Sequence, residues 1–252
     1  MIEKRQFYIN GAWVDPVEGK DHHVINPSNE EPCATISIAG QADVDAAVAA
    51  AKSAFSPWMM TPLETRLSYL EKVRDAYAER AEEMAQVMSL EMGAPIDMSR
   101  SQQVGAGTGH IDAIIEAGRN YHFVEMMGSD APNARIVHEA IGVVAMITPW
   151  NWPMNQVTLK VIAALVAGCT MVLKPSEESP LSAMLFAECI HAAGLPKGVF
   201  NLVNGDGAVT GTAMTGHPDI DMVSFTGSSR AGKLISKNAA DTLKRVSLEL
   251  GG

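Results

Sequence analysis

Five short apolar runs recur in the second half of the chain, and a stretch with helical spacing separates each run from the next. The apolar runs are residues 143–147, 171–174, 199–203, 222–225 and 246–250. The helical stretches are residues 155–167, 181–193, 209–215 and 230–240. Strands that are apolar on both faces and alternate with helices are typical of a parallel sheet with right-handed crossovers. The pattern therefore predicts an α/β fold, with a Rossmann-like five-stranded parallel sheet over residues 142–252 and helices on both faces.

The first 123 residues predict short strands followed by helices, which we assign to the same domain. The Asn10-Gly11 pair lies between two apolar runs, as in a tight β-hairpin. A first helix is expected to end at Pro57. Thr61 is expected to cap the next helix, because Pro and Glu follow it at the first and third helical positions. A further helix is expected over residues 103–121.

Residues 124–141 interrupt the helical pattern. They hold a turn cluster at 128–133, followed at 135–139 by the alternation of an exposed strand. We expect a hairpin that protrudes from the domain and contacts a second copy of the chain. This contact predicts a homo-oligomer of the full-length form, either a dimer or a tetramer.

Composition and charge narrow the range of partners. The 252 residues carry a formal net charge of -10, which disfavours binding to nucleic acid. The three cysteines form no CxxC pair, which argues against a zinc site or a disulfide framework and suits a reducing cytoplasm. The most apolar stretch, residues 157–172, is interrupted by Lys160 and Gly168, so no membrane span is predicted. A cytoplasmic protein that acts on a small molecule is the expectation.

Polar residues follow the predicted strands at the edge where such folds bind ligands. Asn151 lies in a loop with two Trp and two Pro, where its amide would donate to a developing oxyanion or would simply cap the next helix. The local pattern alone favours the cap. Lys174 and Glu177 follow the second strand and fit equally well a pair facing a bound ribose or an exposed pair at a helix start.

Glycines and one carboxylate mark the remaining strand ends. Gly227 and Ser228 precede a predicted helix, so free N–H groups there form a candidate anion site. Gly207 also follows a strand, in a Gly-x-Gly pair that is weak evidence by itself. Glu249 lies between two leucines and is expected to be partly desolvated, as suits a general base. The alternative for Glu249 is a simply exposed side chain.

The order of these motifs resembles that of the aldehyde dehydrogenase superfamily. In sequence they are Pro-Trp-Asn-Trp-Pro, Lys-Pro-Ser-Glu, Asn-Gly-Asp-Gly, Phe-Thr-Gly-Ser and Leu-Glu-Leu-Gly-Gly. The resemblance implies that Asn151 is an oxyanion-hole amide, that Glu249 activates a water, and that Lys160 relays a proton. The physical pattern around Lys160 favours instead a structural lysine where a helix meets the sheet. The implied contacts with NAD, or alternatively NADP, are Thr148, Pro149, Trp150, Asn151, Lys174, Ser176, Glu177, Gly207, Gly227 and Ser228.

The resemblance also implies the reaction, which is oxidation of an aldehyde to a carboxylic acid through a cysteine thiohemiacetal and thioester. The family places that cysteine beyond the Leu-Glu-Leu-Gly-Gly motif. The catalytic domain is therefore expected to be absent from these residues, and the fragment alone is expected to be inactive. Cys33, Cys169 and Cys189 are expected to be structural.

Two alternatives to this assignment stay open. One is a stand-alone nucleotide-binding or regulatory module without catalysis, although Asn151 and Glu249 would have little use in it. The other is a different Rossmann-type dehydrogenase. Such an enzyme would carry GxGxxG after the first strand, where this chain has Trp-Asn-Trp-Pro.

Overall fold

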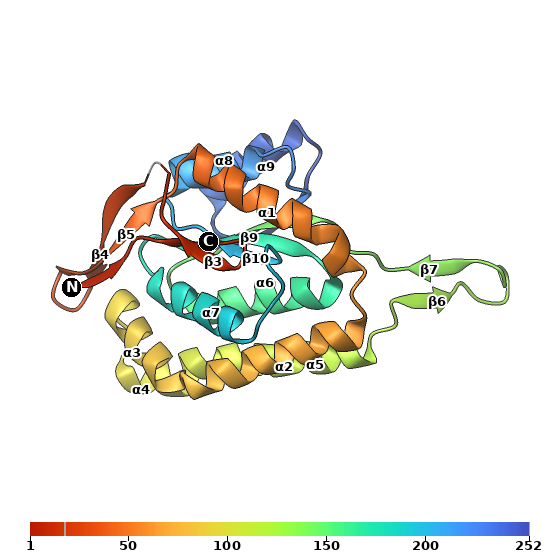
Figure 1. The fold of residues 1–252 in the computed structure, drawn as a ribbon, viewed down its shortest axis with the longest axis horizontal. Helices are drawn as coiled ribbons and strands as arrows, with labels where there is room; N and C mark the ends of the chain where they lie inside the picture. Colours follow the sequence, from red (N-terminus) through yellow and green to blue (C-terminus); the bar gives the residue numbers. More distant parts are fainter. Residues whose placement is uncertain (18, 252) are drawn as a thin grey trace.

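A seven-stranded sheet forms the centre of the computed structural model, which describes residues 1–17 and 19–251 (Figure 1). Its strand order is β12-β11-β8-β9-β10-β2-β3. The run from β12 to β10 is parallel, which confirms the predicted Rossmann-like sheet. The parallel strands are β8 (Val143–Ile147), β9 (Thr170–Lys174), β10 (Phe200–Leu202), β11 (Met222–Ser228) and β12 (Arg245–Gly251). Gly252, the last residue of the Leu-Glu-Leu-Gly-Gly motif, lies outside the described residues.

The N-terminal hairpin extends this sheet by two strands, which the sequence pattern did not predict. Strands β2 (Phe7–Ile9) and β3 (Ala12–Val14) are joined by Asn10 and Gly11, both with positive φ, as a tight hairpin turn requires. Strand β2 pairs antiparallel with β10, and the Asn201 side chain accepts a hydrogen bond from the Asn10 N–H at 2.9 Å. The hairpin thus covers an edge of β10 that would otherwise expose unpaired backbone groups.

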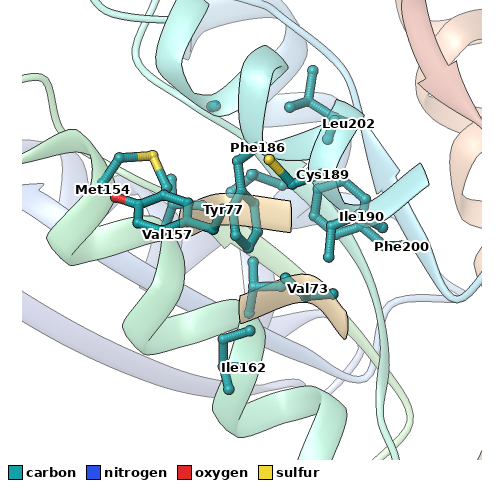
Figure 2. Close-up of a cluster of buried hydrophobic side chains, with 14 of the residues drawn as sticks. Val73, Tyr77, Met154, Val157, Ile162, Phe186, Cys189, Ile190, Phe200 and Leu202 are labelled. Carbon is teal, nitrogen blue, oxygen red and sulfur yellow. The ribbon is translucent and has the colours of Figure 1, made fainter. Parts of the chain in front are cut away.

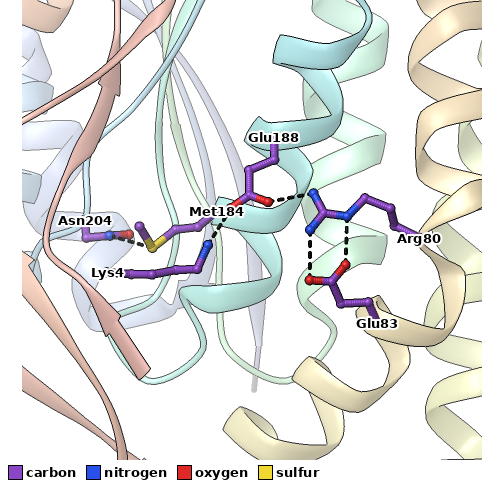
Figure 3. Close-up of polar contacts among 6 residues, drawn as sticks. All are labelled: Lys4, Arg80, Glu83, Met184, Glu188 and Asn204. Atoms are coloured by element: carbon purple, nitrogen blue, oxygen red, sulfur yellow. Dashed lines mark hydrogen bonds and ion pairs between the residues drawn. The ribbon is translucent and has the colours of Figure 1, made fainter. Parts of the chain in front are cut away.

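A smaller sheet lies beside the main one and is joined to α7 by an ion pair. It is built from β1 (Ile2–Lys4), β5 (Glu31–Ile38) and β4 (Lys20–Asn26), in that order. Glu188 accepts hydrogen bonds from Lys4 of β1 and from Arg80, the latter at 2.6 Å (Figure 3). In the same region Asn204 donates to the Met184 sulfur at 3.2 Å.

Helices cover both faces of the main sheet. One face carries α1, α8 and α9, and the other carries α2, α3, α5, α6 and α7 (Figure 1). The helices are α1 (Gln41–Met59), α2 (Leu63–Glu79), α3 (Ala81–Met92), α4 (Ile96–Met98), the π-helical η1 (Ser99–Gln103), α5 (Val104–Asn120), α6 (Pro153–Ala167), α7 (Leu181–Ala192), the π-helical η2 (Gly207–Gly211), α8 (Thr212–Gly216) and α9 (Ser229–Ala240).

Aromatic packing fills the space between the sheet and the helices below it. Phe186 of α7 lies 6.2 Å from the Tyr77 ring and 6.3 Å from the Phe200 ring, measured between centroids (Figure 2). All three rings are buried. Edge-to-face contacts of this kind add to the free energy gained by burying apolar area. Residues from α2, α7 and β10, distant in sequence, therefore form one core.

The junction between α1 and α2 differs from the prediction. Helix α1 continues through Pro57 to Met59 instead of ending there, and Thr61 does not cap α2. The Thr61 hydroxyl donates instead to the Pro57 carbonyl at 2.9 Å, and Arg66 donates to the Met59 carbonyl at 3.2 Å. The carbonyls at the end of α1 lack partners within the helix, so these side chains satisfy the preceding helix rather than the following one.

A two-stranded hairpin projects from the body of the molecule (Figure 1). Strands β6 (Val124–Met126) and β7 (Arg135–Val137) pair antiparallel, and all their residues are exposed.

Candidate functional site

A pocket of about 860 Å³ opens beyond the carboxyl ends of β8, β9 and β11, where α8 and α9 form its wall. This is the position at which open α/β sheets bind ligands, and the volume lies in the usual range for a small-molecule site. Four of the residues predicted from the sequence line it: Lys174, Glu177, Gly207 and Ser228. The fold therefore brings together side chains that follow three different strands.

Lys174 is the most buried charged group of the pocket, with 3 % of its surface exposed. Its ammonium donates to the Pro175 carbonyl at 3.0 Å, to Glu177 Oε2 at 3.3 Å, and to the Gly205 carbonyl. An ammonium has three donors, so all of them are engaged. Burial lowers the pKa of Lys174, and the nearby Glu177 carboxylate opposes that shift. A ligand hydroxyl that binds Lys174 must therefore replace one acceptor, and the half-buried Glu177 is the one free to move.

The sequence pattern missed several polar residues that line the same pocket. Asp206 caps η2 by accepting a hydrogen bond from the Val209 N–H at 2.6 Å. It follows β10 within the Asn-Gly-Asp-Gly motif, so its position at a strand end was the available signal. The other missed polar residues lie on α8, on α9 or directly after α9, where helix periodicity gives no sign of a pocket: Thr212, Thr215, Arg230, Lys237, Asn238 and Asp241.

The start of α9 forms one rim of the pocket. The Ser228 hydroxyl caps this helix by accepting a hydrogen bond from the Ala231 N–H at 3.2 Å. Gly227 is not among the pocket-lining residues. A Cβ atom at Gly227 would lie 2.5 Å from the Phe225 ring, so close packing requires glycine there. The remaining free N–H groups of the first turn, together with the helix dipole, favour an anion at this rim.

The loop after β8 lies outside the pocket-lining set but is connected to it. The backbone N–H of Thr148, which is buried, donates to the Lys174 carbonyl at 3.2 Å, and Pro149 is half-buried. Trp150 is exposed, and its carbonyl accepts a hydrogen bond from Ser179 at 3.3 Å. Ser176 accepts from the Glu178 N–H, also at 3.3 Å, which closes a turn in the loop after β9.

Asn151 does not cap the following helix. Helix α6 begins at Pro153, its N-cap residue is Trp152, and no side chain caps it. The capping role that the local pattern favoured is therefore wrong, because Asn151 lies one residue before the N-cap position. The Asn151 side chain is exposed, while its backbone carbonyl accepts a hydrogen bond from Gln103 at 3.4 Å.

Lys160 and Glu249 lie on the α6 side of the sheet. Lys160 donates to the Ser224 hydroxyl of β11 at 3.0 Å. Burial lowers the pKa of Lys160, and the charge of Glu249 opposes that shift, so the two side chains are near each other. In β12, Glu249 pairs in register with Thr226, two residues beyond Ser224 and on the same face.

The prediction that Glu249 is partly buried is wrong, because its side chain is exposed. Side chains alternate across a strand. Leu248 therefore packs against the covered face near α9, and Glu249 points to the opposite face.

The three cysteines do not line the pocket. Cys169 and Cys189 are buried, and Cys33 is half-buried in β5. Burial raises the pKa of each thiol, that of Cys189 to about 11, so the reactive thiolate is disfavoured at all three positions. Among the described residues no cluster of His, Cys, Asp and Glu is arranged to hold a metal ion. No helix in the same part of the chain has the length and apolar character to cross a membrane.

These features define a dinucleotide-binding type of α/β protein, and comparison with known proteins identifies its family. The aldehyde dehydrogenase family model matches residues 13–252. The chain belongs to the aldehyde dehydrogenase family.

Relatives and solved structures agree with this family. The chain is 48% identical to a 3-succinoylsemialdehyde-pyridine dehydrogenase of a Pseudomonas species, covering 100% of this chain and 52% of that protein. An aldehyde dehydrogenase from Bartonella henselae has a similar structure, with a TM-score of 0.98 and 57% identity over 100% of this chain and 53% of that one. A mutant of aldehyde dehydrogenase C from Pseudomonas syringae, complexed with NAD+ and octanal, matches with a TM-score of 0.95 and 50% identity over 98% of this chain and 50% of that one. The chain thus spans about half the length of the relatives it matches.

Proposed function

We propose that the protein containing this chain is a NAD-dependent aldehyde dehydrogenase, which oxidises an aldehyde to the carboxylic acid. The observation that carries the proposal is the family match over residues 13–252, combined with a pocket at the carboxyl ends of the parallel strands. Two related structures support the proposal: an aldehyde dehydrogenase from Pseudomonas syringae was crystallised with NAD+ and octanal, and a betaine aldehyde dehydrogenase from Staphylococcus aureus with NAD+.

The residues of the pocket fit an adenosine diphosphate group. Lys174 and Glu177 offer a donor and an acceptor for ribose hydroxyls, and the start of α9 at Ser228 offers N–H groups for a phosphate. Gly207 has no neighbour within 4 Å of a built Cβ, so a ligand can approach its backbone closely. A carboxylate at position 177 disfavours a 2′-phosphate, so we propose NAD in preference to NADP.

The second half of the cofactor would follow the loop after β8, next to Thr148, Pro149 and Trp150. Ser176 and Gly227 support the adenosine diphosphate half of the cofactor instead, through the turn and the packing described above. Bound NAD supplies the acceptor for the hydride that leaves the substrate.

The remaining roles concern protons and charge. The amide of the exposed Asn151 side chain donates to an oxyanion that develops on the substrate carbonyl. Glu249 takes a proton from the water that hydrolyses the thioester. Lys160, held by Ser224 near Glu249, stabilises the carboxylate of that base. We propose that the nucleophilic thiol comes from outside these 252 residues, since burial disfavours the thiolate form of Cys33, Cys169 and Cys189.

The test uses the intact protein that carries these residues. Formation of NADH is followed by absorbance with a panel of aldehydes, and NAD binding is measured separately by calorimetry. We expect Asn151→Ala to lower kcat by about 10²–10³, and Glu249→Gln to lower it by about 10²–10⁴. NAD binding without aldehyde oxidation by the intact protein would favour a binding or regulatory module instead. No binding of NAD would overturn the assignment.

We propose that residues 124–141 form an oligomerisation hairpin, and that residues 1–123 and 142–252 form one cofactor-binding domain. Exposed apolar side chains on both strands of the hairpin support the first part: Val124, Met126, Ile136 and Val137. Large exposed apolar patches mark contact sites. Light scattering of the intact protein tests this proposal, and we expect a dimer or tetramer that dissociates when Ile136 and Val137 are both replaced by Glu. A wild-type monomer would contradict it.

A further inference from the structure

A buried carboxylate outside the pocket lining connects α3 to the start of α7. Glu91 lies in the last turn of α3 and exposes only 2 % of its surface. Its two oxygens accept hydrogen bonds from the backbone N–H groups of Leu181 and Ser182, at 2.5 Å and 3.1 Å. No lysine, arginine or histidine within residues 1–17 and 19–251 forms an ion pair with it. The charge is therefore balanced by Ser182 and by the backbone N–H groups at the start of α7, with no basic side chain paired to it.

This placement does not benefit α3 itself. A negative charge near the C-terminus of a helix opposes the helix dipole, and a buried charge without a counterion is costly. Burial accordingly raises the pKa of Glu91 to about 7. The compensation comes from α7, whose first N–H groups carry the positive end of its dipole.

Helix α7 has no cap of its own. Its N-cap residue is Pro180, and no side chain of the adjoining loop accepts from the first turn. Glu91 supplies this cap from another element, 90 residues earlier in the chain. The position of the α7 start is therefore set by α3.

The start of α7 is also the end of the cofactor loop, which we define as residues 175–180. This loop follows Lys174 directly and carries Glu177. Ser179, near its end, donates to the Trp150 carbonyl in the loop after β8. A displacement of the α7 start would therefore move Glu177 and loosen the contact between the two loops that flank the pocket.

We propose that Glu91 is a positioning residue that holds the cofactor loop in its binding conformation by capping α7. The inference rests on the proposed NAD site. Glu91 does not touch the pocket, so it acts only through Leu181, Ser182 and the loop that precedes them.

Glu188 offers a matched control on the same helix. It also ties α7 to a neighbouring segment, through Lys4 and Arg80, but in the second half of the helix, away from the loop (Figure 3). Like Glu91→Gln, Glu188→Gln removes one carboxylate charge that joins α7 to a neighbouring segment. Unlike Glu91→Gln, it leaves the hydrogen bonds at the start of α7 intact.

The test compares wild type, Glu91→Ala, Glu91→Gln and Glu188→Gln in the intact protein, with NAD dissociation constants from calorimetry. Loss of a helix cap costs a free energy that corresponds to about a tenfold change in a dissociation constant. We expect Glu91→Ala to weaken NAD binding and to raise the KM for NAD by about tenfold. Glu91→Gln should recover part of this loss, because its amide oxygen still accepts one N–H. In Glu188→Gln the affinity should stay within about twofold of wild type.

A merely structural role would lower the active fraction, and so kcat, without raising the KM for NAD. Wild-type affinity in Glu91→Ala, or equal weakening in Glu188→Gln, would overturn the inference while leaving the cofactor site intact. A wild-type protein that fails to bind NAD would overturn the proposed function and the inference with it. If Glu91→Ala does not fold, Glu91→Gln decides by the same comparison with Glu188→Gln.

Discussion

Replacing Lys174 with Met tests how far one buried ammonium holds the pocket together. The side chain keeps a similar length but loses three hydrogen bonds, to Pro175, Gly205 and Glu177. Hydrogen bonds to a charged group contribute roughly 1.5–3 kcal/mol each. The ammonium also pays for desolvation, as its lowered pKa indicates. Removing one partner of a buried pair costs about 3–5 kcal/mol, so we expect a net loss of stability of about 3 kcal/mol.

Two measurements on the intact protein check this value. For a protein about twice the length of this chain, a loss of about 3 kcal/mol corresponds to a decrease in Tm of roughly 3–6 °C. NAD affinity should fall by about tenfold or more, because Glu177 loses the cation that orients it. The control is Lys233→Met, which removes the same charge from an exposed position on α9. It should change neither the Tm nor the NAD affinity. A Tm within 1 °C of wild type together with unchanged NAD affinity would refute the reasoning.

Three further predictions concern packing and protonation. Phe186→Ala should cost about 3–5 kcal/mol in denaturant unfolding, and a cost of about 1 kcal/mol or less would show that the aromatic cluster is not tightly packed. Gly107→Ala should destabilise the protein, because a Cβ there would lie 2.4 Å from the Tyr77 hydroxyl. Gly105→Ala, in open space on the same helix, should stabilise α5 by about 1 kcal/mol. Equal Tm shifts in the two variants would contradict this contrast. The folded-state pKa of Glu91, about 7, lies above its ordinary value of 4.5. The free energy of unfolding should therefore fall by about 3 kcal/mol as pH rises through that window, and Glu91→Gln should abolish this slope.

Local sequence patterns were sufficient for the parallel sheet and for part of the pocket. A strand covered by helices on both faces needs a continuous apolar run, so the runs at 143–147 and 222–225 predicted β8 and β11 directly. Ligand sites of such sheets lie at the carboxyl ends of strands, so Lys174, Glu177 and Ser228 were identifiable from their positions alone.

Contacts between distant segments were decided only by the tertiary structure. Nothing in the Phe7–Ile9 strand indicates that it pairs with β10, because many apolar edge strands would fit that edge. Whether Glu249 is buried or exposed depends on which elements cover its face of the sheet. The wall of the pocket depends on how α9 packs against the sheet. Glu91 caps a helix 90 residues away. Sequence by itself determined which strands and turns form, since those preferences act between near neighbours. Which polar groups meet was determined by packing, since that depends on how the whole chain buries its apolar surface.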